Sequence, residues 1–267
     1  MAVNRKRTGL VLILGIFLGI FLIFVSSCTL EEEGKTALTL NKTEDFQHDK
    51  EGDTMKILGL DIELLRHASV KIKDRKIIYI DPFELTEGPA PEKADIVLVT
   101  HSHYDHCSPK DIEKISNENT IIITVADAQS KLSNLKVKGI TVTEPGKTIK
   151  INGENISITA VPAYNPDKEF HPKENNWVGF IVEMDGVRVY HAGDTGLIPE
   201  MKEIETDIAL LPVGGTYTMN AEEAAQATKM FKSCKIAIPM HYGVLVGTAS
   251  DAEDFKEKAG CEVKILM

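Results

Sequence analysis

The stretch Ile96-Val97-Leu98-Val99-Thr100-His101-Ser102-His103-Tyr104-Asp105-His106 is the most informative part of this chain for both fold and chemistry. Its four aliphatic residues predict a buried strand, and three imidazoles and a carboxylate follow directly. On an extended segment His101 and His103 point the same way, so they can share one cation. Once the chain turns, Asp105 and His106 can face a second. Zinc accepts imidazole and carboxylate ligands, so the stretch predicts a metal site at the end of a strand.

Further motifs lie along the chain: Ile78-Tyr79-Ile80-Asp81-Pro82, Glu169-Phe170-His171-Pro172, His191-Ala192-Gly193-Asp194-Thr195-Gly196 and Pro239-Met240-His241-Tyr242-Gly243. Together with the first stretch they resemble the motifs of the metallo-β-lactamase superfamily of hydrolases, from about Ile57 to Leu266. The resemblance implies an α/β fold, an αβ/βα sandwich of two mixed β-sheets with external helices. Alternating short β-rich runs and helical stretches point to the same layered architecture. One helix is predicted from Ser108 to Ser116, with Ser108 as its N-cap and Pro109 at its first position, and another from Ala252 to Lys258.

Two segments resemble particular branches of this superfamily. Arg66-His67-Ala68-Ser69 and the stretch from Leu211 to Met219 are similar to the superfamily branch that contains L-ascorbate-6-phosphate lactonase. They resemble the N-acyl-phosphatidylethanolamine phospholipase D group more loosely. Neither likeness names a substrate.

The family resemblance also implies a ligand set for two metal ions. The first ion would be held by His101, His103 and His171, the second by Asp105, His106 and His241, and both by a bridging Asp194. Zinc is the expected metal, and Mn²⁺ or Fe²⁺ would also accept these ligands. Such a pair of ions holds a bridging hydroxide as the nucleophile. Asp105 would also accept a proton when water attacks.

Other residues are expected to support this site. In the family, the aspartate at position 81 braces the ligand loop. His67 and His191 each have two readings, a residue that hydrogen-bonds a ligand or substrate, or a core histidine with its own partners. Tyr217 follows Gly214-Gly215, which lets its loop approach the metals closely. Its hydroxyl either donates to a developing oxyanion or has a structural role.

The leading functional prediction is a di-metal hydrolase of a small ester, lactone or phosphoester. A membrane-tethered phospholipase D-like phosphodiesterase, a β-lactamase and a non-catalytic metal-binding surface protein are the alternatives. The known β-lactamases fill the bridging position by other means, and a structural zinc site is closed by four ligands. Nucleic acid is not an expected partner, because 40 acidic residues outnumber 30 basic ones and no basic cluster stands apart. The sequence leaves the oligomeric state open.

The N-terminus resembles a bacterial lipoprotein signal over residues 1–27. Arg5, Lys6 and Arg7 precede an apolar run from Leu10 to Val25, and two serines then precede Cys28. Cys28 would be lipidated, residues 28–54 would form a polar tether, and residues 55–267 the hydrolase domain. An uncleaved anchor is the alternative. Either reading places the protein at a membrane, on the extracytoplasmic face.

Two local expectations depend on strand assignment. Ile62 to Lys73 and Lys76 to Asp81 are predicted to form a hairpin that turns at Asp74-Arg75. Cys234 and Cys261 each lie two residues before a predicted strand of one β-α-β unit, so they are candidates for a disulfide. The sequence shows no internal repeat.

Overall fold

The structure is a computed structural model that describes residues 54–85 and 91–266. The predicted signal at 1–27, the lipidation site Cys28 and the tether up to residue 53 lie outside the described residues. Within the described ranges, no helix combines the length and the apolar character that crossing a membrane requires.

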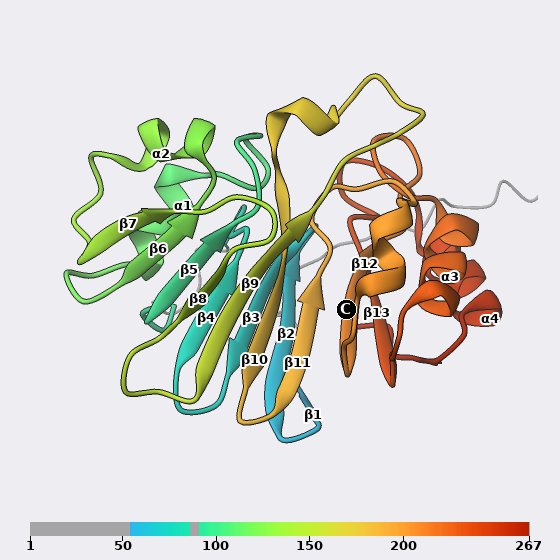
Figure 1. Ribbon diagram of the computed structural model, residues 1–267, viewed down its shortest axis with the longest axis horizontal. Helices are drawn as coiled ribbons and strands as arrows, with labels where there is room; N and C mark the ends of the chain where they lie inside the picture. The colour runs from blue at the N-terminus through green and yellow to red at the C-terminus, as the bar shows by residue number, and fades with distance from the viewer. Residues whose placement is uncertain (1–53, 86–90, 267) are drawn as a thin grey trace, which may run out of the picture. The chain divides into compact units, whose positions relative to one another are not determined.

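The described residues form two mixed β-sheets of seven strands each (Figure 1). The first sheet has its strands in chain order: β1 (Met55–Ile57), β2 (Leu60–Arg66), β3 (Ser69–Lys73), β4 (Ile77–Ile80), β5 (Ile96–Val99), β6 (Ile121–Thr124) and β7 (Gly139–Val142). The second runs from its last strand back to its first: β14 (Glu262–Val263), β13 (Ile236–Met240), β12 (Ile208–Pro212), β11 (Val187–His191), β10 (Val178–Met184), β9 (Ile156–Pro162) and β8 (Thr148–Lys150).

Both sheets repeat one pattern of strand directions. The first four strands of each sheet pair antiparallel, β1 to β4 in one and β8 to β11 in the other. The remaining strands continue in parallel from β4 and from β11. The chain therefore contains a structural repeat that its sequence does not reveal. In parallel strands the carboxyl ends share one edge, so the loops after them gather there.

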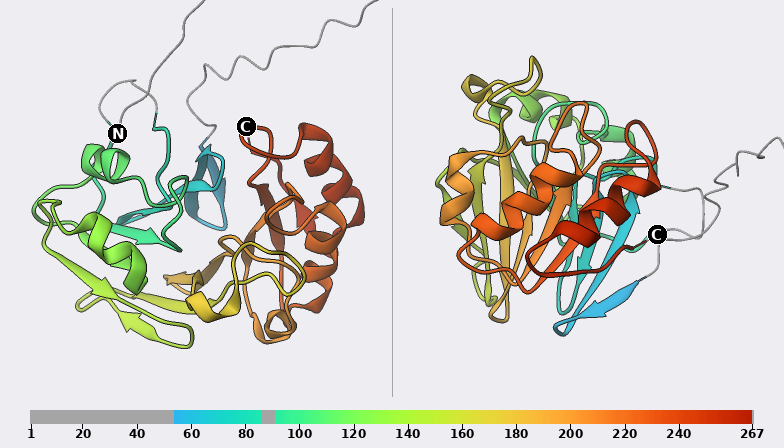
Figure 2. Two further views of the ribbon diagram at one scale, coloured as in Figure 1. Left: turned by 90° about the horizontal axis from the view of Figure 1, so that it is seen from above. Right: turned by 90° about the vertical axis from the view of Figure 1, so that its right-hand side faces the viewer.

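The helices lie beside the two sheets. They are α1 (Pro109–Ile115), α2 (Ala126–Leu132), α3 (Ala221–Met230) and α4 (Ala249–Lys258), with short 3₁₀ helices η1 (Lys173–Asn175) and η2 (Pro199–Glu203). Figures 1 and 2 show α1 and α2 with the first sheet, and α3 and α4 with the second. Ser108 caps α1 as predicted, because its side chain accepts a hydrogen bond from the backbone N–H of Asp111. The predicted αβ/βα sandwich is confirmed.

The core is built mainly from aliphatic strand residues. Strand β5 is buried along its whole length, as expected for a parallel strand covered on both faces. Strands β12 and β13 are buried in the same way. The antiparallel strand β9 instead alternates buried and half-buried residues, because one of its faces is closer to solvent. A rigid core under the parallel strands fixes the loops that follow them.

Two predicted boundaries were wrong. The expected single strand from Ile62 to Lys73 is two strands, β2 and β3, because the chain turns at His67, which has a φ of 54°. The predicted turn at Asp74-Arg75 does separate β3 from β4. Helix α4 begins at Ala249 rather than Ala252, because Thr248 and Asp251 form a reciprocal cap at its start.

The two cysteines considered for a disulfide are free thiols in this structure. Ile236 pairs with Glu262 in the parallel register of β13 and β14. Cys234 and Cys261 are thus offset by one position, rather than side by side as expected. The Cys234 thiol donates to the carbonyl oxygen of Ile236 at 3.6 Å, and the interaction between the neighbouring thiols raises the pKa of Cys234 and lowers that of Cys261.

Candidate metal centre

The loops after the parallel strands bring the predicted site residues to one edge. Asp81 follows β4, the His101–His106 loop follows β5, Asp194 lies just after β11, and His241 follows β13. His171 joins them from the long connection between β9 and β10. All seven residues proposed as ligands therefore meet at one place, although they come from four separate loops.

The first group consists of His101, His103 and His171, as the family pattern implies. The Nδ1 atom of His103 lies 3.1 Å from Nε2 of His101 and 3.2 Å from Nε2 of His171. His101 and His171 are buried, and His103 is half-buried. Donor atoms on one ion lie about 3.0–3.4 Å apart when each metal–nitrogen bond is about 2.1 Å. The three nitrogens thus fit a shared cation.

Asp194 stands between this group and the second one. Its Oδ2 atom lies 3.3 Å from Nε2 of His171 and 3.2 Å from Nε2 of His241. Its other oxygen, Oδ1, lies 3.2 Å from Nε2 of His106. The carboxylate is almost fully buried. Oδ2 therefore lies beside ligands of both groups, and Oδ1 beside a ligand of the second, which is an arrangement that suits a bridging ligand.

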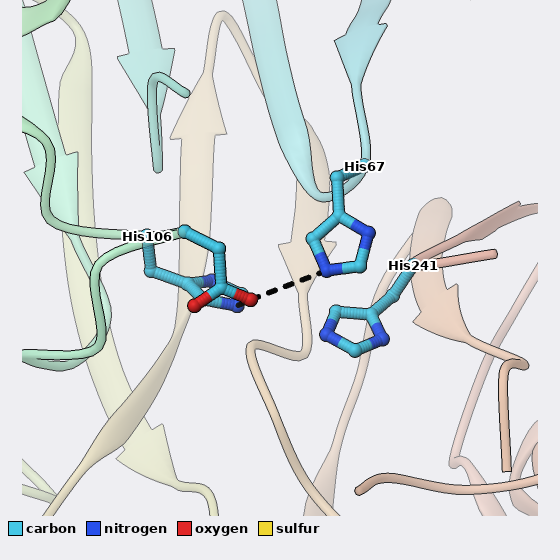
Figure 3. Close-up of side chains that lie close together, drawn as sticks. His67, His106 and His241 are labelled. Carbon is cyan, nitrogen blue, oxygen red and sulfur yellow. Dashed lines mark ion pairs between the residues drawn. The ribbon is translucent and has the colours of Figure 1, made fainter. Parts of the chain in front are cut away.

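The second group is larger than expected. Asp105, His106 and His241 were predicted, and their ligand atoms lie within 4.8 Å of one another together with that of His67. Asp105 Oδ2 lies 3.6 Å from Nε2 of His106 and 3.4 Å from Nε2 of His67. Figure 3 shows His67, His106 and His241 facing one space, with the dashed line joining His67 to the carboxylate.

Asp81 braces the ligand loop, as expected. Its Oδ1 accepts a hydrogen bond from the backbone N–H of Thr100 at 2.8 Å, and its Oδ2 accepts from the Thr100 hydroxyl at 2.6 Å. Since that hydroxyl proton is used, Thr100 Oγ1 can only accept from Nδ1 of His101, 3.0 Å away. Asp81 Oδ2 also lies 2.8 Å from Nδ1 of His106. Both imidazoles are thereby left with a free Nε2 lone pair directed at the metal positions.

Two supporting residues were missed by sequence reasoning. Trp177 is the single tryptophan of the chain. Its ring centroid lies 4.8, 4.7 and 5.4 Å from those of His101, His103 and His171, so the indole packs against all three imidazoles of the first group. Its indole N–H donates to Asp127 Oδ2 at 2.8 Å. A lone tryptophan just before a strand gives no sequence signal of this role.

Asn165 is the second missed residue, and it connects a ligand to the backbone of two aromatic residues. Its Nδ2 donates to the carbonyl oxygens of Phe170 at 2.9 Å and of Tyr217 at 2.6 Å, and lies 3.1 Å from Nδ1 of His171. The backbone N–H of Asn165 also donates to the carbonyl of His171. One buried amide thus fixes both the His171 loop and the Tyr217 loop.

His67 and His191 have different hydrogen-bonding environments in the structure. The ring of His191 is hydrogen-bonded on both sides, to the carbonyl of Ala68 at 2.8 Å and by the backbone N–H of Gly193 at 3.2 Å. It has the contacts of a core histidine. His67 is equally buried, yet neither of its ring nitrogens has a hydrogen-bond partner among the described residues.

Tyr217 lies at the margin of the site. Its ring packs edge-on against Phe170, with centroids 4.7 Å apart, and it is partly exposed. Gly214 allows this loop to come close to the His241 loop, because a Cβ there would overlap the carbonyl oxygen of His241. No hydrogen bond within the described residues uses the Tyr217 hydroxyl, so the phenol is free for a ligand.

The donor set carries buried atoms that require a partner. His106 Nε2, Asp194 Oδ1 and both ring nitrogens of His241 form no hydrogen bond in the described part of the chain. Unpartnered buried polar atoms are costly, and a cation at their centre would satisfy them. Imidazole nitrogens and carboxylate oxygens are suitable ligands for zinc, manganese or iron. The residues therefore fit a pair of metal ions.

The electrostatics of the site favour neutral imidazoles at His101 and His103 beside a charged Asp194. Burial opposes protonation of His106, but Asp194 and Asp81 outweigh it and raise the pKa of His106. Burial lowers the pKa of His101 well below its ordinary value and also lowers that of His103. Both are neutral at pH 7, the form that binds metal. Burial opposes ionisation of Asp194, but His106 and His241 outweigh it, so the pKa of Asp194 lies well below its usual range. A permanent negative charge thus sits between the two groups.

Comparison with known proteins identifies the family. Residues 61–241 match the beta-lactamase superfamily domain. A UPF0173 metal-dependent hydrolase of Thermococcus onnurineus is 33% identical over 217 residues, which cover 77% of this chain and 95% of the relative. A second, from Thermoplasma acidophilum, is 39% identical over 206 residues, covering 73% of this chain and 88% of the relative.

Solved structures agree with these relatives. A crystal structure from Parabacteroides distasonis, assigned as a metal-dependent hydrolase, is 38% identical with a TM-score of 0.69, covering 80% of this chain and 97% of that one. Igni18, a metallo hydrolase of Ignicoccus hospitalis, is 25% identical with a TM-score of 0.62, covering 77% and 94%. The likeness to the lactonase branch stays a prediction. The chain is a metal-dependent hydrolase that belongs to the beta-lactamase superfamily, among the UPF0173 proteins.

Proposed function

We propose that this protein is a di-metal hydrolase that cleaves a small ester, lactone or phosphoester. The observation that carries the proposal is the position of Asp194, whose carboxylate lies within 3.3 Å of His171 of the first group and within 3.2 Å of His106 and His241 of the second. A carboxylate so placed can hold two ions a short distance apart. Two bound ions would supply a water of lowered pKa and would polarise the bond to be cleaved.

The chain's own residues have separate tasks in this proposal. His101, His103 and His171 would hold the first ion, and Asp105, His106 and His241 the second. Asp105 is the one proposed ligand with a partly exposed carboxylate, with 13% of its side chain accessible. It can therefore accept a proton from an attacking water at the open side of the site. Tyr217 would donate a hydrogen bond to the substrate oxygen that gains charge.

Exposed apolar side chains on the loops around the site favour an uncharged, apolar substrate. Six large apolar side chains are exposed in the described ranges, and four of them lie on loops that carry or adjoin ligands: Tyr104, Phe170, Tyr217 and Leu245. Tyr104 lies between two ligands in the chain, and Phe170 directly precedes His171. Exposed apolar side chains gathered at one site indicate binding of apolar groups.

Basic side chains beside these loops already have acceptors. Lys168 contacts the carbonyl of Gly215, and Lys173 pairs with Glu200 at 2.8 Å. Arg66, next to His67, pairs with Glu84 at 3.1 Å. A phosphate group would need cations that are free to bind it. This favours a carboxylic ester or lactone over a phosphorylated sugar as the substrate.

The test is a substrate panel for the metal-loaded full chain in detergent. The panel contains aryl esters of increasing acyl length, a lactone, a phosphodiester, a phospholipid and a β-lactam. We expect hydrolysis of esters or lactones, its loss with a chelator, and its return with metal. Phe170→Ala should raise KM most for long acyl chains, whereas Val142→Ala, an exposed apolar control, should not. A metal-loaded protein that cleaves neither the esters, the lactone nor the phosphodiester would refute the proposal, and preference for the phospholipid would favour the phospholipase alternative.

A further inference from the structure

His67 is buried without the contacts that a buried histidine normally has. Its side chain is fully inaccessible, and neither Nδ1 nor Nε2 forms a hydrogen bond with the described residues. Nearly all buried polar side-chain atoms in proteins have a partner. His191, in the same core region, meets that rule on both nitrogens. Packing alone does not account for an imidazole at position 67.

The surroundings of His67 are those of a ligand. Its ligand atom lies within 4.8 Å of those of Asp105, His106 and His241. Its ring is 3.8 Å from that of His241, centroid to centroid, and its backbone carbonyl accepts a hydrogen bond from the His241 N–H at 2.8 Å. Figure 3 shows the two rings side by side beneath the β2–β3 turn. The 3.4 Å from His67 Nε2 to Asp105 Oδ2 is a spacing that two ligands of one ion adopt.

The structural repeat leads to the same conclusion. His67 lies between the second and third strands of the first sheet, and His171 between the second and third strands of the second sheet. Both residues have positive φ, 54° and 61° respectively. Histidine adopts this conformation more readily than most residues, but it is still uncommon. Each half of the fold thus directs one imidazole into the site from the connection between its second and third strands.

We propose that His67 is a ligand of the second ion, in addition to Asp105, His106 and His241. The inference rests on the two-ion site proposed above. With Asp194 bridging and water completing the shell, the second ion would have six ligands rather than five. Zinc favours four ligands in proteins, whereas Mn²⁺ and Fe²⁺ accept six-coordinate shells readily. The second position should therefore prefer Mn²⁺ or Fe²⁺, and the first position should remain suited to zinc.

Two variants separate ligation from mere support of His241. His67→Asn keeps a side chain that tolerates positive φ but is too short to reach the ion. His67→Phe keeps an aromatic ring against His241 and removes the nitrogens. Calorimetric titration of the metal-free full chain in detergent with Mn²⁺ gives the affinity of each site. We expect both variants to weaken the second site by more than the roughly 10–100-fold caused by losing a residue behind a ligand, with the first site unchanged.

The outcomes are distinct. If His67→Phe binds the second Mn²⁺ as the parent does, the histidine only supports His241 and the inference is wrong. If the parent itself binds a single ion, the two-ion proposal fails first and this inference fails with it. A Co²⁺-loaded sample gives an independent readout, since the visible spectrum of the second site should change in both variants. Thermal unfolding of the metal-free variants checks that each is folded.

Discussion

Asp81 and His106 form a fully buried pair in which Oδ2 of the carboxylate lies 2.8 Å from Nδ1 of the imidazole. The same carboxylate holds the backbone and the hydroxyl of Thr100, and through that hydroxyl it fixes the tautomer of His101. One side chain behind the site therefore sets the orientation of a ligand in each metal group. Such residues are an established means of tuning metal affinity.

Asp81→Asn should weaken metal binding by about 10–100-fold while leaving the protein folded, because the amide presents an N–H where His106 needs an acceptor. Titration of the metal-free protein with Zn²⁺ would measure the metal affinity. Asp185→Asn is a matched control, because Asp185 also has positive φ but lies in the exposed β10–β11 turn. Equal affinities for the two variants would show that Asp81 does not orient a ligand.

Asn165→Ala should weaken metal binding by the first group and should also release Phe170 and Tyr217 from their positions beside it. The variant removes the amide that holds the Phe170 and Tyr217 carbonyls beside His171. We expect about 10–100-fold weaker binding of the first ion and a higher KM for apolar esters. Asn155→Ala, which removes an exposed asparagine bonded to Asp185, serves as the control. A change in KM with no change in metal affinity would mean that Asn165 positions only Phe170 and Tyr217, which would contact the substrate, and does not support the first metal site.

Cys28→Ser should release the protein from membranes if residues 1–27 are a lipoprotein signal. A chain with two or more acyl groups is stably anchored, whereas the serine variant cannot be acylated there. Detergent phase partitioning and mass spectrometry of the exported protein would measure it. An unchanged mass and unchanged partitioning of the variant would instead support an uncleaved anchor.

The thiols should differ in reactivity towards an alkylating agent at pH 8. Burial raises the pKa of Cys107 to about 12, so almost none of it is thiolate at that pH. The pKa of Cys261 is lowered by the neighbouring Cys234 thiol, and its side chain is partly exposed. Cys261 should therefore be alkylated first and Cys107 last. Peptide mapping without reductant also tests the disulfide, because two unreactive thiols at 234 and 261 would show that the pair is oxidised.

The fold and most of the candidate site could be predicted from sequence because they depend on local patterns. Aliphatic runs such as Ile96–Val99 mark buried strands, and ligand-type side chains directly follow them. The family resemblance then supplied the grouping of ligands that lie far apart in the chain. The N-terminus of α1 could also be predicted, because Ser108 is its N-cap and Pro109 occupies its first helical position.

The parts that sequence missed depend on contacts between distant segments. The alternating pattern from Ile62 to Lys73 continues through His67, so nothing marks the turn that aims this imidazole at the site. Asn165 and Trp177 act through partners on distant segments, 52 and 50 residues away in the contacts with Tyr217 and Asp127. No periodicity of the chain encodes such pairings. Only the topology brings them together.

The most direct test of this account is the metal content of the active enzyme. The full chain, purified in detergent and active on an ester or lactone, should contain two transition-metal ions per chain by elemental analysis. Asp194→Asn should retain at most one and lose activity by orders of magnitude, since the bridging carboxylate is gone. Asp185→Asn should match the parent in both respects. A fully active preparation that contains one ion or none would contradict the two-metal mechanism.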